Sequence, residues 1–587
     1  MRIVHCSLFN RKIKGYIMKK ILSIILSAVM TFSVVGIAAN AKENDDLSFA
    51  VASDIHYSAP EAELEKTNDS ELYWHAIRRC EMENETGLII DEFLNQCAES
   101  DDVEYVLISG DLANRGRSRP EDHLAVAQKL RDFEKKSGKE VYVINGNHDA
   151  SNDQATTFER FKEIYAEFGY DHALTTRDDD CSYTANLGKK YRLIALDTNH
   201  ATKSTEDGMT AEKLKWVKEQ AKLAKKDGRY PIVMMHHNLL DHLPIQRVLS
   251  RNFIVKFHFT TAELFADWGI KTVFTGHEHC SDATVYTSAL GNRLYDFATT
   301  SLAMYPLEYR VIKYNDNEIR YETRSVDKID YDALTAATKG YTDEQISAMK
   351  KDLRAFSKGY LKAGVQYRLE LSLSPEKMGI DENAAYSKPI IYAVDKLIEL
   401  LRMPLCGENS LQSIAKEYGI EIPDSDYETG WDLATDLVAW HYSGGEHFDM
   451  SSVEVTTLLR AFAAILRSDF AGVADDVLLK AVNNILGDMG YGPIADSLIK
   501  FCISKFGVYT KAEIFLVGIA SPVLYKFAYD NDGVDDNNGT IEGYGTVNLK
   551  SNVTNIFKNL GSLSEKMVFY IQLVLSYLAK LNVIFLK

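Results

Sequence analysis

Six short apolar runs, each ending in polar side chains capable of chemistry, constrain the fold of the first half of this chain. They are DLSFAVASD, VEYVLISGD, EVYVINGNHD, YRLIALDTN, YPIVMMHHN and IKTVFTGHEH. Between them lie stretches with helical periodicity, at Glu85–Glu99, His123–Ser137, Phe158–Gly169 and Ala211–Asp227. Apolar strands that alternate with helices of this length predict an α/β domain with a buried sheet. In such folds, ligands bind at the carboxyl ends of the strands, where the polar residues of these runs fall.

The second half of the chain has a different pattern. After about Asp327, amphipathic helical stretches are expected at Asp343–Lys358, Ala385–Arg402, Trp431–Tyr442, Val453–Arg467 and Ala474–Leu486. At 587 residues the chain is too long for one core, and we expect two to four domains. The predicted boundaries are 42–326 for the α/β domain, 327–530 for a mainly helical accessory domain, and 531–587 for a turn-rich segment followed by a helix.

Two features of the last segment leave alternatives open. Asp530–Gly545 is acidic and rich in turn residues, but it lacks the glycine and acidic spacing of an EF-hand, so a surface loop is favoured over a calcium site. Met567–Leu586 is apolar but carries Gln572, Lys580 and Asn582. An amphipathic or packed helix is therefore favoured over a membrane span.

The first 41 residues have the pattern of a targeting segment. Basic residues precede the apolar run ILSIILSAVMTFSVVGIAA, which ends at the small-residue sequence Ala39-Asn40-Ala41. This order predicts a signal peptide over 1–41 and a secreted or cell-surface protein, with an uncleaved membrane anchor as the alternative. Met18 begins MKKIL and is a second candidate for the start of translation.

Charge and cysteine content exclude some classes of function. The formal net charge is -18, which argues against nucleic acid as the primary partner because few cations would face its phosphates. A small phosphorylated substrate is not excluded, since bound metal ions can reverse the local charge of a site. The seven cysteines form no C-x-x-C pair, so neither a zinc knuckle nor a thioredoxin-like centre is supported.

Taken singly, the strand-end motifs are weak signals. Asp54 and His56 occupy alternate positions of an extended segment, so both can face one ion, although D-x-H is common by chance. Asp111 follows a glycine, which is also a frequent turn signal. His236 and His237 are adjacent and point apart in an extended chain, so we expect one of them to be a ligand.

Two further motifs offer more. Gly146-Asn147-His148-Asp149 combines a tight turn with a neutral oxygen ligand, a titratable ring and a carboxylate, although Asp149 could simply cap a helix. His277 and His279 again stand at alternate positions and can face one locus, unless they form a satisfied pair in the core. Glu278, between them, is expected to turn outward.

The combination of motifs predicts a binuclear metal centre. Together they supply enough nitrogen and oxygen ligands for two divalent cations, with Asp111 placed to bridge them. A mixed imidazole and carboxylate set without thiolate favours Mn, Fe, Zn or Co over Mg or Ca. The predicted ligands are Asp54, His56, Asp111, Asn147, His236, His277 and His279.

In this order, the motifs D-x-H, G-D, G-N-H-D, a strand-end His and G-H-x-H resemble those of the calcineurin-like metallophosphoesterases, over about residues 47–310. Within that family the resemblance is to the branch of cyclic-nucleotide and glycerophosphodiester phosphodiesterases. It implies a β-sandwich of two mixed sheets flanked by helices, which refines the simpler α/β expectation. It also implies one metal held by Asp54, His56, Asp111 and His279, and another held by Asp111, Asn147, His236 and His277.

The resemblance implies the chemistry as well. His148 would act as an acid outside the metal shell, oriented by Asp149, while a metal-bridging hydroxide attacks phosphorus. We therefore expect an exported hydrolase of phosphodiesters or phosphomonoesters, with a substrate that is extracellular or at the cell surface and attachment through the C-terminal region. The alternative is a non-catalytic cell-surface binding protein built on this fold. His200, His237 and His242 are candidates for substrate contact, or ordinary histidines.

Overall fold

The computed structural model describes residues 46–59, 79–203, 208–242, 246, 251–337, 342–381, 383, 387–446, 453–467, 475–488 and 533–548. The predicted signal peptide and the predicted helix at Met567–Leu586 lie outside these residues. All of the elements below belong to one of the two compact units of the chain, Leu47–Lys587. Within the described ranges, no helix is both long and apolar enough to cross a membrane. The five cysteines in these ranges form no disulfide with one another.

The first of two sheets has six strands in the order β13-β12-β11-β1-β2-β3. Strands β1, β2 and β3 run parallel, and β11, β12 and β13 continue from β1 in antiparallel fashion. The strands are β1 (Leu47–Ala52), β2 (Tyr105–Ile108), β3 (Glu140–Val143), β11 (Glu308–Tyr314), β12 (Glu318–Ser325) and β13 (Gly539–Glu542). The parallel part brings the ends of β1, β2 and β3 to one edge, so the motifs that follow these strands come together.

The second sheet has seven strands in the order β4-β5-β6-β7-β8-β10-β9. Its central strands β6, β7, β8 and β10 are parallel, and the flanking strands β5 and β9 pair in antiparallel fashion. The strands are β4 (Thr175–Thr176), β5 (Tyr183–Leu187), β6 (Tyr191–Leu196), β7 (Tyr230–Met235), β8 (Thr272–Thr275), β9 (Asp282–Thr287) and β10 (Arg293–Ala298). The histidine motifs follow β7 and β8.

The two sheets pack face to face, and the alternation of side chains along β7 shows how. Ile232 and Met234 lie in the core between the sheets, whereas Val233 and Met235 lie in a second core against helices. Because side chains of a strand alternate between faces, a run that is apolar at every position covers both. The continuous apolar runs of the sequence are therefore strands buried on both sides.

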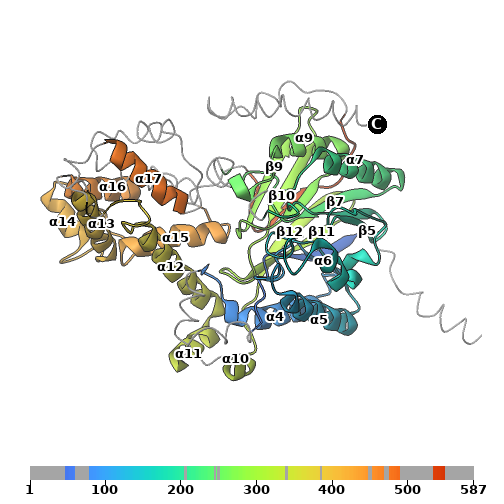
Figure 1. The fold of residues 1–587 in the computed structure, drawn as a ribbon, viewed down its shortest axis with the longest axis horizontal. Coiled ribbons are helices and arrows are strands. Elements are labelled where there is room, and N and C mark those ends of the chain that lie inside the picture. Colours follow the sequence, from blue (N-terminus) through green and yellow to red (C-terminus); the bar gives the residue numbers. More distant parts are fainter. Residues whose placement is uncertain are drawn as a thin grey trace, which may run out of the picture. The chain divides into compact units, whose positions relative to one another are not determined.

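Helices cover the outer faces of the sandwich. Helices α4 and α5 lie on one side of the paired sheets, and α7 and α9 lie on the other (Figure 1). They are α4 (Thr86–Glu99), α5 (Pro120–Ser137), α6 (Phe158–Ile164), α7 (Ala211–Lys226) and α9 (His258–Trp268). The expected sandwich of two mixed sheets between helices is confirmed. The helix expected over Phe158–Gly169 ends early: α6 stops at Ile164, where Tyr165 leaves the helical conformation, and a π-helical turn over Ala166–Tyr170 follows.

The expected C-terminal helical region is also confirmed, and it has its own apolar core. Its helices are α10 (Tyr331–Ala337), α11 (Asp343–Lys351), α12 (Leu353–Ser372), α13 (Ser387–Arg402), α14 (Leu411–Glu417), α15 (Gly430–Tyr442), α16 (Val453–Leu466) and α17 (Asp475–Asp488). The stretch expected as one helix over Asp343–Lys358 is two, because the extended backbone of Asp352 ends α11 and its side chain caps α12 at Ala355.

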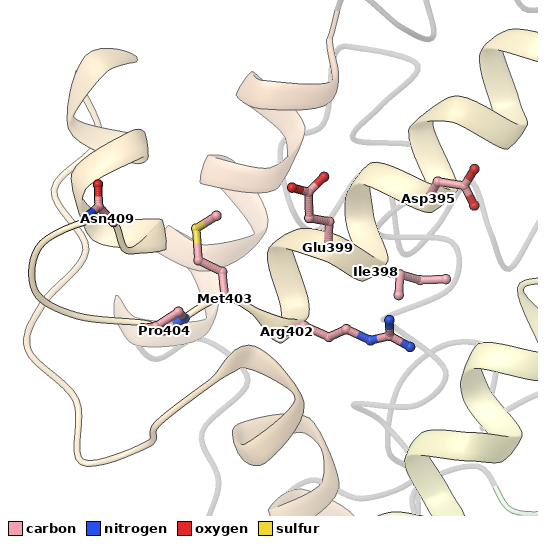
Figure 2. A pocket seen from close by; sticks show the side chains of 7 residues that line it. All are labelled: Asp395, Ile398, Glu399, Arg402, Met403, Pro404 and Asn409. Atoms are coloured by element: carbon pink, nitrogen blue, oxygen red, sulfur yellow. The ribbon is translucent and has the colours of Figure 1, made fainter.

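An open hollow of about 680 Å³ lies on this helical region (Figure 2). It is lined by Asp395, Ile398, Glu399, Arg402, Met403, Pro404 and Asn409. The charge of Arg402 is balanced by an ion pair with Glu370 of α12. No residue of the predicted metal centre lines this hollow.

The turn-rich segment differs from the expected surface loop. Its residues Gly539–Glu542 form β13, which extends the first sheet by pairing with β12. Further along, the ring of Tyr544 stacks on that of Tyr230, with centroids 4.6 Å apart. The turn residues of this segment concealed a short strand because Thr540, Ile541 and Glu542 are too few to form an apolar run. The segment is part of the first sheet.

The aromatic packing between the sheets can be tested at Phe274. This fully buried ring lies edge-to-face on Phe49, with centroids 5.4 Å apart, and stacks on Phe297 at 5.5 Å. Phe274→Ala should lower the free energy of unfolding by about 3–5 kcal/mol, since it opens a cavity in the core. Denaturant unfolding followed by circular dichroism measures this. The half-exposed Leu124→Ala is the control, and equal effects of the two variants would contradict the packing described.

Candidate metal centre

The loops after β1 and β2 run side by side and carry the first predicted ligands. The backbone N–H of Asp54 donates to the carbonyl of Gly110 at 3.0 Å, and that of His56 donates to the carbonyl of Asp111 at 2.9 Å. Asp54, His56 and Asp111 all have positive φ, between 47° and 50°. Such a backbone is unfavourable for residues with a side chain and is concentrated at functional sites, so the strain here fits a site that fixes ligands.

Asp111 lies at the middle of the group, as its predicted bridging role requires. Its Oδ2 is 3.2 Å from Nε2 of His236 and 3.8 Å from Nε2 of His56, so two imidazoles face one oxygen from different loops. Its Oδ1 accepts the backbone N–H of His148 at 2.7 Å. The carboxylate is therefore held by the G-N-H-D loop while its other oxygen points between the two histidines.

One group of candidate ligand atoms surrounds Asp54. Its Oδ1 lies 3.1 Å from Nε2 of His279 and 3.6 Å from Nε2 of His56, and the two imidazole nitrogens are 3.2 Å apart. This oxygen is buried and has no hydrogen-bond partner among the described residues. Neighbouring ligands at about 2.1 Å from one ion lie roughly 3 Å apart. The spacing and the unpartnered oxygen both fit a metal ion.

A second group lies on the other side of Asp111. Nε2 of His236 is 3.0 Å from Oδ1 of Asn147, and the ligand atoms of Asp111, His236 and His277 all lie within 4.8 Å of one another. The other ring nitrogen of His236 is 3.0 Å from the carbonyl of Ser109, which can only accept a hydrogen bond. Nδ1 therefore carries the proton and Nε2 is left as the ligand atom, as in many histidines that bind metals.

The pKa values in the two groups show how strongly the side chains depend on each other's charge. Burial alone would raise the pKa of the Asp54 carboxyl, but His279 and His236 hold it well below its usual range. Burial would lower the pKa of His236, but Asp111 and Asp54 raise it to about 9. In contrast, burial and the charge of His236 lower the pKa of His277 to about 3. Each buried carboxylate here thus depends on positive charge from its neighbours, a charge that bound metal ions would also supply.

The seven residues predicted as ligands are therefore brought together from the ends of β1, β2, β3, β7 and β8. The predicted ligands form two groups: Asp54, His56 and His279 on one side, and Asp111, Asn147, His236 and His277 on the other. His56 and Asp111 also form a third group with His148. A donor set of imidazole, carboxylate and one amide fits two divalent ions that share Asp111.

The structure gives Asp149 a role that the sequence did not predict. Its carboxylate accepts the backbone N–H groups of Gly146 and Ala113 at 2.7 and 3.1 Å, and so fixes the G-N-H-D loop. The ring of His148 is instead held by the carbonyl of Asn114, 2.8 Å from Nδ1. The expectation that Asp149 orients the ring of His148 is therefore wrong. Burial and repulsion from Asp111 raise the pKa of Asp149 to about 8.

Two motif glycines are required by the close approach of ligand side chains. A Cβ on Gly146 would collide with the carboxylate of Asp111, and a Cβ on Gly276 would collide with the side chains of Ser53 and Asp54. Each glycine thus leaves room for a ligand supplied by a different loop. This explains physically why a glycine precedes the ligand in these motifs.

The remaining expectations for this region have mixed outcomes. Glu278 is buried, within 3.3 Å of the Gln246 amide, so the expectation that it turns outward is wrong. His237 is also buried, with Nδ1 2.7 Å from the hydroxyl of Thr198. His242 is buried between two aspartates, Asp282 and Asp296, which makes it part of the interior. His200 accepts a backbone N–H from Thr202 at 3.2 Å, and its contact with substrate stays a prediction.

Sequence reasoning missed a network beside His56 and His148. Arg79 makes two hydrogen bonds of 2.9 Å to Glu81, and it donates to the side-chain oxygen of Asn114 at 2.7 Å. Asn114 is the residue whose carbonyl holds His148. Burial would lower the pKa of His56, but Glu81 and the neighbouring aspartates raise it to about 9. Arg79 and Glu81 belong to no motif and precede α4 without a strand, so the sequence carried no signal for them.

The part of the chain that carries these residues matches the profile of a known protein family. Residues 47–281 match the profile of the family described as calcineurin-like phosphoesterase. These residues form a calcineurin-like phosphoesterase domain. The domain contains all seven predicted ligands together with His148 and Asp149.

Comparisons with other proteins are more distant. A dimetal phosphatase from Danio rerio has 11% identity and a TM-score of 0.34, over 48% of this chain and 96% of that one. A predicted phosphoesterase from Streptococcus pneumoniae TIGR4 has 12% identity and a TM-score of 0.22, over 48% of this chain and 90% of that one. Similarities of this size support no further conclusion. No curated protein matches the chain.

The space that Gly146 leaves for Asp111 can be tested directly. Gly146→Ala should reduce the manganese bound per chain from two ions toward one or none, because the added methyl group displaces the bridging carboxylate. Metal analysis after loading with Mn²⁺ and gel filtration measures this. Gly359→Ala is the control, since a Cβ there meets no atom within 4 Å. Two ions retained by Gly146→Ala would contradict the assigned position of Asp111.

Proposed function

We propose that this chain is an exported phosphoesterase that uses two metal ions to hydrolyse phosphodiesters or phosphomonoesters. The observation that carries the proposal is the convergence of the seven predicted ligands into two groups inside a calcineurin-like phosphoesterase domain. Oδ2 of Asp111 faces both groups, toward His56 of one and His236 of the other. Without bound ions, the buried Oδ1 of Asp54 makes no hydrogen bond among the described residues, and only the ring nitrogens of His279 and His56 face it.

The protein's own residues set up this chemistry in two ways. Asp111 and Asp54 would hold the ions and supply the negative charge that balances them. Ser109 fixes the tautomer of His236 so that Nε2 faces the site. When bound, two such ions supply a hydroxide nucleophile at neutral pH and neutralise charge on the phosphoryl oxygens.

In this proposal His148 donates a proton to the leaving-group oxygen of the substrate. The carbonyl of Asn114 accepts the proton of Nδ1, so Nε2 is the atom that faces the site beside His56 and Asp111. Burial lowers the pKa of this ring, which leaves it neutral in the absence of substrate. An anionic phosphate ester beside the ring would favour its protonated form, and Nε2 could then donate to the leaving alkoxide.

Export and substrate rest on the sequence. The basic and apolar segments before Ala39-Asn40-Ala41 support cleavage after Ala41. An exported enzyme meets extracellular or surface-bound phosphate esters, and we propose these as substrates. Mass spectrometry of protein secreted by an expressing bacterium should give an N-terminus at Lys42. Retention of residues 18–41 on protein from the membrane fraction would instead support an uncleaved anchor.

The activity test compares chromogenic phosphodiester and phosphomonoester substrates. Protein beginning at Lys42 and supplied with Mn²⁺ should hydrolyse at least one of them, and the ratio of rates selects the ester class. Asp111→Asn should abolish turnover, and His148→Ala should lower kcat by about 10²–10⁴-fold while two ions stay bound. Leu124→Ala, on the exposed side of α5, is the matched control and should keep wild-type rates.

Either of two results would overturn the proposal. The first is folded wild-type protein that binds two ions yet hydrolyses neither ester class nor any phosphate ester offered. The second is turnover that survives Asp111→Asn. Folded protein that binds no divalent ion would favour the alternative of a binding protein built on this fold.

A further inference from the structure

The loop that carries His277 and His279 connects β8 to β9 and is supported from behind by parts of the chain far away in sequence. Both histidines have positive φ, at 68° and 61°, so the loop is held in an unfavourable backbone conformation. Surrounding contacts must maintain such a conformation. Ser281 lies two residues after His279, at the end of the loop. Most of the contacts that support the loop are made at Ser281.

The first support comes from the turn-rich segment before β13. The hydroxyl of Ser281 donates to Oδ1 of Asn537 at 2.9 Å and receives a hydrogen bond of 3.0 Å from the guanidinium of Arg310. The same guanidinium donates to the carbonyl of Asp536 at 2.5 Å, and the backbone N–H of Ala283 donates to the Asp536 carboxylate at 3.2 Å. Arg310 is completely buried, so these bonds are shielded from water.

The second support comes from the end of α15, in the helical region. The backbone N–H of Ser281 donates to the carbonyl of Tyr442 at 3.1 Å. The side-chain amide of Asn537 donates to the carbonyls of Ser443 and Gly444 at 2.9 and 3.2 Å. A Cβ on Gly444 would collide with the carbonyl of Ser281, so the two backbones approach as closely as they can. Asn537 thus joins the loop to the helical region with one side chain.

A third support reaches His279 through apolar packing. Nδ1 of His279 lies 3.1 Å from the sulfur of Met304. Met304 and Tyr305 pack in a small cluster with Leu361 of α12 and Ala439 of α15. The helical region therefore contacts Met304, which lies against the predicted ligand His279, and Ser281, which ends the ligand loop.

We propose that Asn537 is a positioning residue for the metal centre, and that Asp536 and Asn537 together with the turn 442–444 act as a clasp on the ligand loop. The clasp fixes the backbone at His277 and His279 so that both rings face their ions. The C-terminal half of the chain is then part of the metal centre and not an appended module. This inference rests on the proposed two-metal function.

The experiment measures metal affinity without turnover. Chelator-treated full-length mature protein is titrated with Mn²⁺ by calorimetry, well below its melting temperature. Asn537→Ala should bind at least one ion about tenfold more weakly, because it removes the bonds to Ser281 and to the turn. Asn538→Ala is the matched control and should keep wild-type affinity. The side-chain oxygen of this adjacent asparagine accepts a hydrogen bond of 3.4 Å from the backbone N–H of Thr323, away from the ligand loop.

Two further measurements distinguish a positioning role of Asn537 from a role in the stability of the fold alone. The melting temperature of each metal-free variant shows whether the fold itself has weakened. Ser281→Ala removes one hydroxyl, and the double variant with Asn537→Ala should lose no more affinity than the larger single loss if both act through the same bond. Ser281→Ala also replaces Asn537→Ala as the test variant if the latter does not fold.

The possible outcomes test the clasp and the proposed two-metal function separately. Two bound ions in wild type with weakened binding in Asn537→Ala, at an unchanged metal-free melting temperature, support the clasp. Wild-type affinity in both Asn537→Ala and Ser281→Ala overturns the clasp and leaves the proposed function standing. Wild-type protein that binds no Mn²⁺ overturns both.

Discussion

The mutual dependence of buried aspartates and histidines at one edge of the sandwich is the constraint on which the rest of this structure depends. Asp111 lies between imidazoles from two other loops, and Oδ1 of Asp54 has no hydrogen-bond partner among the described residues. Buried carboxylates are costly unless cations or hydrogen bonds compensate them. The positive φ values of the ligand residues and the glycines that make room for them add to that cost. Bound metal ions are the compensation that this donor set fits.

Much of the fold and of the candidate site could be predicted because the same residues determine both. An apolar run buried on two faces must end where the chain leaves the sheet, and the polar ligands begin there, as at Asp54 after β1 and His236 after β7. The later strands β9 to β12 were not predicted individually, since no motif marks them and charged residues interrupt their apolar pattern, as at Arg310 and Lys313. β13 was hidden among turn residues, and its partner β12 lies more than 200 residues earlier.

The errors in the site concern contacts that residue type alone does not specify. Asp149 was expected to hold the ring of His148, but its oxygens accept backbone N–H groups of the turn it follows. The carbonyl of Asn114 holds the ring. Because every residue has a backbone carbonyl, no sequence pattern indicates which one makes this contact. Similarly, Arg79 and Asn537 come near the ligands only through the folded chain. Sequence motifs thus indicate which side chains gather at the candidate site, whereas the groups that orient them come from tertiary structure.

The central claim is that two ions bind on either side of Asp111, and anomalous diffraction from crystals grown with Mn²⁺ tests it most directly. The account predicts two anomalous peaks about 3.5–4 Å apart. One should lie among Asp54, His56 and His279, the other beside His236 and His277, and both should contact the carboxylate of Asp111. A single peak, or two peaks of which neither contacts Asp111, would contradict the account.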